Sequence, residues 1–281
     1  MHQYPIRTSR QRQRGEDLKK IHITCIKIGY GEDIMDKIIR ITIGLIIVVL
    51  VAFIATVAYT GFVDQAFRTS LTSTYSYTFS IVTDSRLDNV TLFIPVPEDH
   101  NGNSPLVNRF SAQDIEGLPG DWQVTLFDTG KATVAKITAP RILPLPVTST
   151  SHPYTVRLVI NTGSDTMIAT RAPVEEGVMF RPVQNLLTTE CTGTRNETTG
   201  TPVCSRYTVP IYADYQTTMN ASVSITSALQ GKNRWTIFEP QSNEYQTDIS
   251  VRLNGEHHGW TVMNGMLESN RGQYTIPAPS R

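Results

Sequence analysis

Residues 41–59 form an uninterrupted apolar segment, ITIGLIIVVLVAFIATVAY, without a charged side chain. As an α-helix these 19 residues span about 30 Å, which matches the hydrocarbon core of a lipid bilayer. The helix of a soluble protein normally keeps a polar stripe, whereas only two threonines and one glycine interrupt the apolar side chains here. The segment therefore predicts a membrane-spanning helix, with residues 38–62 in contact with the lipid bilayer.

The charges on the two sides of this segment predict its orientation. Residues 1–40 carry nine basic and five acidic side chains, whereas residues 60–281 carry 16 basic and 20 acidic ones. Basic residues beside a membrane helix favour the cytoplasmic side, and Lys37 and Arg40 lie on the N-terminal side. We expect a single-pass cell-membrane protein with a basic cytoplasmic segment at residues 1–37, an anchor at residues 38–62 and an extracytoplasmic region at residues 63–281.

Two questions about the N-terminus stay open at this point. A cleavable signal peptide is the alternative to an anchor, but its apolar region is usually shorter and ends in a small-x-small site that residues 57–59 do not provide. An uncleaved signal anchor is therefore favoured. Residues 1–34 have neither a helical nor a strand period, and Met35 opens the charged stretch before the anchor. Translation begins either at Met1, which adds a basic arm, or at Met35.

The chain after the anchor alternates polar and apolar residues, which is the period of a β-strand with one buried face. Residues 74–81, TYSYTFSI, show the pattern without a break. Strands are predicted at residues 74–81, 89–96, 122–128, 132–139, 154–160, 206–212, 222–226, 234–239, 249–253, 259–263 and 273–276.

Turn-forming pairs such as Asn101-Gly102, Asn254-Gly255 and Gln230-Gly231 lie between these stretches. No helical period longer than about ten residues follows the anchor, which argues against a parallel sheet. We expect a mainly β protein in which one transmembrane helix precedes an antiparallel β-sandwich. The sandwich is either one unit or two packed subdomains that divide near residues 173–199.

The three cysteines lie on different sides of the anchor. Cys25 precedes it, and Cys191 and Cys204 follow it on the outward side, where thiols oxidise. The spacing of a zinc site is missing, so we predict that Cys191 and Cys204 form a disulfide.

Three Asn-x-Ser/Thr sequons predict sites for N-glycosylation in a cell that modifies surface proteins. They begin at Asn89, Asn196 and Asn220, and Asn196 lies in the most loop-like surroundings.

The sequence contains no motif of an enzyme, a cofactor site or a metal site. Glu256, His257 and His258 with Trp260 form the one local cluster able to do chemistry, but adjacent histidines in a strand point to opposite faces, so we interpret the cluster as a turn. Acidic stretches at residues 98–100 and 175–176 lack the order of a calcium loop and are interpreted as solvated loops. We therefore assign no catalytic, cofactor-binding or metal-ligating residue.

Composition narrows the class of partner. Basic and acidic side chains number 25 each, so there is no overall electrostatic field to attract nucleic acid.

Five aromatic residues of the outward region belong either to its core or to a binding patch, namely Tyr212, Tyr215, Trp235, Tyr245 and Trp260. We expect binding or scaffolding at the cell envelope, with an envelope protein or glycan as partner. The alternatives are an anchored hydrolase using loop carboxylates and an accessory subunit of a membrane complex.

Two neighbouring stretches resemble a known kind of protein. Residues 75–81, YSYTFSI, are followed by residues 89–97, NVTLFIPVP, and a short initial anchor precedes both. This arrangement resembles uncharacterised single-pass envelope proteins of methanogenic archaea. The resemblance implies an archaeal cell-surface protein with an outward β-rich domain, and it carries no assigned functional residue.

Overall fold

The computed structural model describes residues 31–143, 154–191 and 201–274. The chain divides into two compact units, Met1–Val57 and Ala58–Arg281. Helix α1, Gly31–Ser70, runs through the predicted anchor, and its part from Met35 to Ser70 is long and apolar enough to cross a membrane. The side chains of residues 35–61 are exposed, which sets α1 apart from the buried core helix of a soluble protein.

In the described part of the chain, ten strands and two short helices follow α1. The strands are β1 Thr72–Thr83, β2 Leu87–Pro95, β3 Gln123–Asp128, β4 Thr133–Ile142, β5 Tyr154–Ser164, β6 Gln184–Thr189, β7 Val203–Gln216, β8 Ser222–Thr236, β9 Pro240–Asn254 and β10 His257–Gly272. The helices are α2 Val107–Ser111 and α3 Pro173–Glu176.

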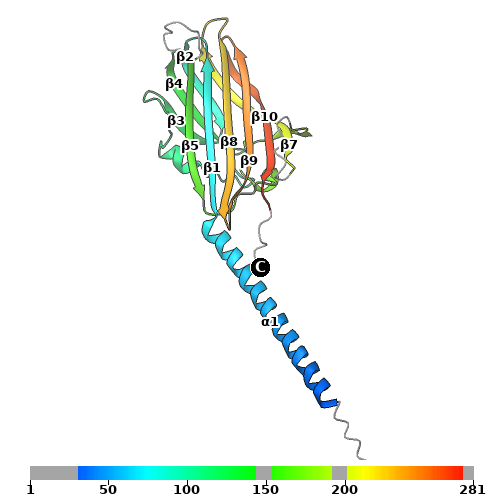
Figure 1. Cartoon of the computed structure of the whole chain (residues 1–281). Coiled ribbons are helices and arrows are strands. Elements are labelled where there is room, and N and C mark those ends of the chain that lie inside the picture. Colours follow the sequence, from blue (N-terminus) through cyan, green and yellow to red (C-terminus); the bar gives the residue numbers. More distant parts are fainter. Residues whose placement is uncertain (1–30, 144–153, 192–200, 275–281) are drawn as a thin grey trace, which may run out of the picture. The chain divides into compact units, whose positions relative to one another are not determined.

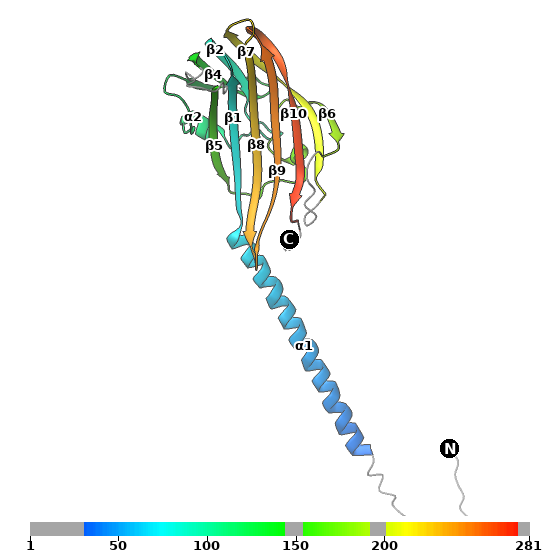
Figure 2. The ribbon, with the colours of Figure 1, turned by 45° about the horizontal axis from the view of Figure 1, so that its top comes forward.

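All strand pairs are antiparallel, and the strands form one sheet in the order β3-β4-β2-β7-β10-β9-β8-β1-β5, with β6 beside β7 (Figure 1). The sheet curls, so that β2 and β4 lie behind β1 and β5 in the views of Figure 1 and Figure 2. A β-bridge between Glu116 and Val159 joins the loop before β3 to edge strand β5. The predicted antiparallel, mainly β fold is confirmed, and it is built from one curled sheet.

The interior of the curl is the hydrophobic core. The alternation in strand β1 accounts for one part of this core. Tyr77, Phe79 and Ile81 are 1–2% exposed, whereas the threonine and the serine between them face outward. Helix α2 adds Phe110, whose ring packs edge-on against Tyr77 at 5.7 Å.

Strand β8 is longer than the sequence predicts, because it runs through a glycine expected in a turn. The sequence predicts a turn at Gln230-Gly231, but β8 continues through both residues and ends at Thr236. Gly231 lies opposite Tyr245 of β9, and the Tyr245 ring occupies the space that a Cβ atom would need. The glycine therefore serves packing between strands, and the turn lies at residues 237–239.

Two strands differ from the sequence-based prediction, and one question that the sequence left open concerns the division of the β region. Strand β6 was missed because QNLLTT does not alternate and, among the described residues, it pairs with β7 alone. Residues 273–274 are not in a strand, and residues 275–276 lie outside the described residues. The division near residues 173–199 is not found in the described chain, because β2 on one side of it pairs with β7 on the other.

Candidate functional site

The structure divides the five aromatic residues singled out above into two groups. Tyr215, Trp235 and Tyr245 point into the curl and are at most 1% exposed. Trp260 of β10 is 67% exposed, and Tyr212 of β7 is half-buried on the same outer face. Three of the five therefore belong to the core, and two are available for binding.

Tyr212 and Trp260 belong to a row of rings that crosses the outer face of the sheet. We call Phe127 of β3, Phe93 of β2, Tyr212 and Trp260 the aromatic row. Phe93 lies directly opposite Tyr212, and Tyr212 lies directly opposite Trp260, in the register of β2, β7 and β10. Successive ring centroids are 6.1, 5.5 and 5.7 Å apart. The register of adjacent strands thus assembles residues from distant parts of the chain.

The rings pack edge to face, with interplanar angles of 62°, 77° and 73°. Aromatic pairs favour this arrangement because the positive ring edge meets the negative ring face. Lys136 of β4 lies opposite Phe93, with its Nζ atom 5.9 Å from the ring centroid. Mutual packing therefore orders the row, although Phe127 remains 44% exposed and Trp260 67% exposed.

A polar cluster adjoins the row at the next pair of outward positions. His258 lies opposite Asp214, and its Nδ1 atom is 2.6 Å from Asp214 Oδ1 while its Nε2 atom is 2.6 Å from Glu256 Oε1. The hydroxyl of Tyr212 donates a hydrogen bond of 3.2 Å to Asp214 Oδ2, which links this cluster to the row. Hydrogen bonds that His258 donates to the carboxylates of Glu256 and Asp214 raise its pKa above the ordinary value. The cluster presents carboxylates and an imidazole beside exposed rings.

The sequence interpretation of this cluster as a turn is only partly right. Glu256 lies between β9 and β10, whereas His257 and His258 open strand β10. The two histidines do point to opposite faces, since the ring of His257 lies 6.4 Å from the core residue Tyr215.

A hollow of about 620 Å³ lies where the β3–β4 hairpin approaches the loop after β2. It is lined by Glu98, Asp99, His100, Asn101, Gly102, Asp128, Gly130, Lys131, Ala132, Thr133, Arg181, Pro182 and Val183. Asp128, which follows the row residue Phe127, borders it.

The carboxylates of this hollow hold the loops in place. Glu98 is 3% exposed and accepts a hydrogen bond from the Thr133 backbone N–H at 3.0 Å. Asp99 Oδ1 accepts hydrogen bonds from the backbone N–H groups of Asn101 and Asn103 at 2.8 and 2.9 Å. Burial opposes ionisation of Asp99, but the hydrogen bonds from Asn103 and Asn101 lower its pKa. Among the described residues, no group of three or more His, Cys, Asp or Glu side chains is arranged to hold a metal ion.

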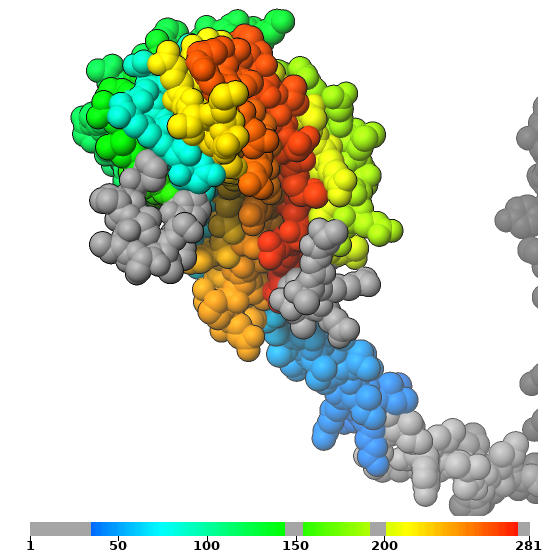
Figure 3. All heavy atoms as spheres, turned by 90° about the horizontal axis from the view of Figure 1, so that it is seen from above, coloured from blue at the N-terminus to red at the C-terminus, as the bar shows by residue number. Residues whose placement is uncertain are grey.

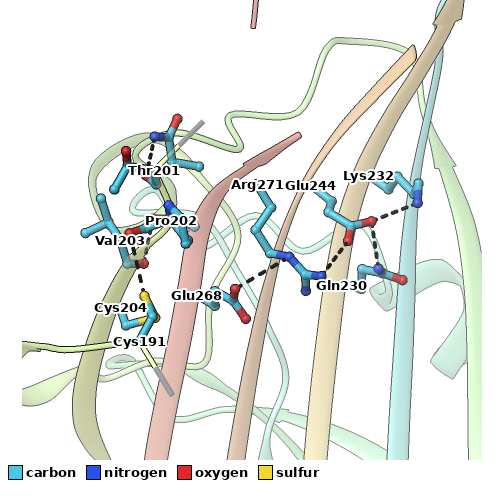
Figure 4. Close-up of polar contacts among 12 residues, drawn as sticks. Cys191, Thr201, Pro202, Val203, Cys204, Gln230, Lys232, Glu244, Glu268 and Arg271 are labelled. Atoms are coloured by element: carbon cyan, nitrogen blue, oxygen red, sulfur yellow. Dashed lines mark hydrogen bonds and ion pairs between the residues drawn. A yellow bond between two sulfur atoms is a disulfide. The ribbon is translucent and has the colours of Figure 1, made fainter. Parts of the chain in front are cut away.

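The predicted disulfide is present, between Cys191 after β6 and Cys204 in β7, with their Cα atoms 5.2 Å apart (Figure 4). It fastens the start of β7 to the segment after β6. Cys25 lies outside the described residues.

Figure 4 also shows an ion-pair network on the outer face of β8, β9 and β10. Glu244 Oε2 accepts a hydrogen bond of 2.8 Å from Lys232, and Glu244 Oε1 lies 3.7 Å from Arg271. Arg271 in turn lies 3.5 Å from Glu268. These charges satisfy one another across three strands, which indicates a stabilising role.

Two of the three sequons fall on exposed asparagines. Asn89 lies in β2 at a register shift against β7, and Asn220 lies in the turn between β7 and β8. That turn lies beside the β9–β10 connection, where the Gly255 N–H donates to the Ala221 carbonyl at 2.8 Å (Figure 3). Asn196 lies outside the described residues.

Comparison with known proteins does not add to this description. No protein-family model, curated protein or solved structure matches the chain.

Sequence reasoning missed Phe93 and Phe127. Phe93 lies inside the apolar run LFIPV, where every residue looks suited to a core, although its neighbours Leu92 and Ile94 are the buried ones. The alternation of the strand could have identified Phe93 as an outer-face residue, because Phe93 is two residues from Thr91 and therefore points to the same side of the sheet.

Proposed function

We propose that the protein is a single-pass membrane protein whose β domain lies outside the cytoplasm and binds a glycan of the cell envelope. The aromatic row with its adjoining carboxylates is the observation that carries this proposal. Its ligand is a glycan chain that lies across β3, β2, β7 and β10.

The chemistry of a sugar fits this surface. The C–H groups of a pyranose ring make one face apolar, which suits the negative face of an aromatic ring, and its hydroxyl groups donate hydrogen bonds. Trp260 supplies the most exposed ring, and Asp214 and Glu256 supply acceptors next to it. An exposed aromatic cluster with a polar border is typical of a binding surface.

The outward location rests on separate support. Lys37 and Arg40 favour a cytoplasmic N-terminus, and the disulfide between Cys191 and Cys204 favours an oxidising compartment for the β domain. Residues 38–62 provide the contact with the bilayer.

The test uses the full-length protein in lipid nanodiscs and a panel of polysaccharides, with binding measured by depletion on insoluble glycans and by titration with soluble ones. Trp260→Ala is expected to weaken binding about tenfold, the effect of losing roughly 1.4 kcal/mol of aromatic contact. Leu187→Ala is the matched control, because Leu187 is 68% exposed and lies on β6, outside the row.

Two results would overturn the proposal. One is equal glycan binding by the wild type and Trp260→Ala. The other is the absence of glycan binding while a co-purifying protein is lost specifically from Trp260→Ala, which would make the row a protein interface.

A further inference from the structure

The hairpin between β8 and β9 carries an exposed aromatic residue at its tip. Phe238 lies between Thr236, where β8 ends, and Pro240, where β9 begins, and it is 67% exposed. An exposed phenylalanine leaves a large apolar surface in contact with water unless another surface covers it.

The last turns of α1 pack against this hairpin. The ring of Phe238 lies 6.4 Å from that of Tyr59 and 6.1 Å from that of Phe62. Further along α1, Phe67 packs edge-on against Trp235 at 5.7 Å. These residues all belong to the unit Ala58–Arg281, so the contacts are internal to it.

Hydrogen bonds fix the end of α1 to the same hairpin. Ser70 Oγ donates to the Thr236 carbonyl at 2.9 Å and accepts from the Thr236 N–H at 2.9 Å. Only Leu71 separates α1 from β1. The end of α1 therefore enters the β domain directly and is held by the backbone of Thr236 and the side chain of Trp235, both in β8.

The positions of Tyr59 and Phe62 on α1 indicate the level of the hairpin relative to the bilayer. The uncharged apolar segment of α1 ends at residue 59, and aromatic residues at the end of a membrane helix favour the interface between hydrocarbon and water. Phe238 contacts both Tyr59 and Phe62, so it lies at the same level. Arg234 and Glu239 are exposed beside the tip and suit the polar headgroups.

We propose that the tip of the β8–β9 hairpin, with Phe238 foremost, inserts into the headgroup region of the bilayer that α1 crosses. The surface that covers Phe238 is thus the lipid of the outer leaflet. The hairpin and α1 together hold the β domain at the membrane. The inference rests on the proposed membrane span of α1 and is independent of glycan binding.

Tryptophan quenching by lipids with brominated acyl chains tests this contact in the full-length protein in nanodiscs. Phe238→Trp places a reporter at the tip, and Tyr59→Trp reports whether α1 lies at the expected depth. Phe127→Trp is the matched control, because Phe127 is an exposed phenylalanine of the outer face, on β3. Each variant is compared with the wild type, which contributes the signal of three native tryptophans.

Brominated lipid is expected to reduce the added emission of Phe238→Trp as strongly as that of Tyr59→Trp, and to leave that of Phe127→Trp unchanged. Quenching of Tyr59→Trp without quenching of Phe238→Trp would overturn the inference and leave the anchor intact. Absence of quenching in both would overturn the inference together with the proposed span. Loss of glycan binding in Trp260→Ala affects none of these readouts, so the two proposals fail separately.

Discussion

Asn233 and Asn243 face each other across β8 and β9 in the interior of the curl, where Asn233 Nδ2 donates a hydrogen bond of 2.7 Å to Asn243 Oδ1. Both side chains are fully buried. Asn233 Oδ1 accepts hydrogen bonds from Ser73 Oγ at 2.7 Å and from the Ile168 N–H at 2.9 Å, and Asn243 Oδ1 accepts one from Thr170 Oγ1 at 2.8 Å. The network ties the segment before α3 to three neighbouring strands.

Asn233→Ala is expected to lower the free energy of unfolding by about 3 kcal/mol, because it leaves several buried donors and acceptors without partners. Urea titration of the detergent-solubilised full chain, followed by tryptophan emission, measures the change. Asn161→Ala is the control, since Asn161 is exposed on β5. A similar midpoint for both variants would contradict a structural role of the network.

Gly265 of β10 lies directly opposite Tyr207 of β7, and a Cβ atom at Gly265 would lie 2.5 Å from the Tyr207 Cζ atom. Gly265→Ala is therefore expected to destabilise the protein by about 1–3 kcal/mol through overpacking. Gly163→Ala is the matched control on β5, because the nearest atom to its Cβ would be 4.0 Å away. Thermal unfolding by circular dichroism distinguishes the two, and equal melting temperatures would show that the tyrosine ring can move aside.

Removal of the disulfide is expected to cost about 3 kcal/mol, because Cys191 and Cys204 close a loop with a sequence separation of 13 residues. The double substitution Cys191→Ser and Cys204→Ser avoids a new free thiol, and urea titration compares it with the wild type. Thiol counting on the unfolded wild type without reductant should find one reactive cysteine, Cys25, of the three in the chain. Three reactive thiols would contradict the disulfide.

His258 is expected to titrate above the ordinary value of 6.5, since hydrogen bonds to Glu256 and Asp214 raise its pKa in the folded state. Because the folded pKa is the higher one, the stabilising contribution is fully present below pH 6.5 and is lost as the pH rises through the folded value. NMR titration of histidine-labelled protein measures this pKa directly. Asp214→Asn and Glu256→Gln should each shift it down, and a pKa unchanged in both variants would show that the contacts do not persist in solution.

Much of the architecture could be predicted because it depends on local patterns. The charge-free run at residues 41–59 predicts a helix of membrane length, and the alternation in residues 74–81 predicts the buried face of β1. The pairing of Cys191 with Cys204 followed from their position and from the lack of a metal-ligand spacing. Strand β6 escaped prediction because its sequence does not alternate and its place is decided by pairing with β7.

The candidate site could be predicted only in part, because it depends on which strands become neighbours. The sequence by itself determined the long apolar helix and the antiparallel β character, since both follow from residue periods within a few neighbours. The tertiary structure alone decided that Trp235 enters the core while Trp260 faces outward, and that Phe93, Tyr212 and Trp260 meet in one row. The reason is physical: the register between strands distant in sequence sets which side chains share a face, and that register results from packing of the whole curled sheet.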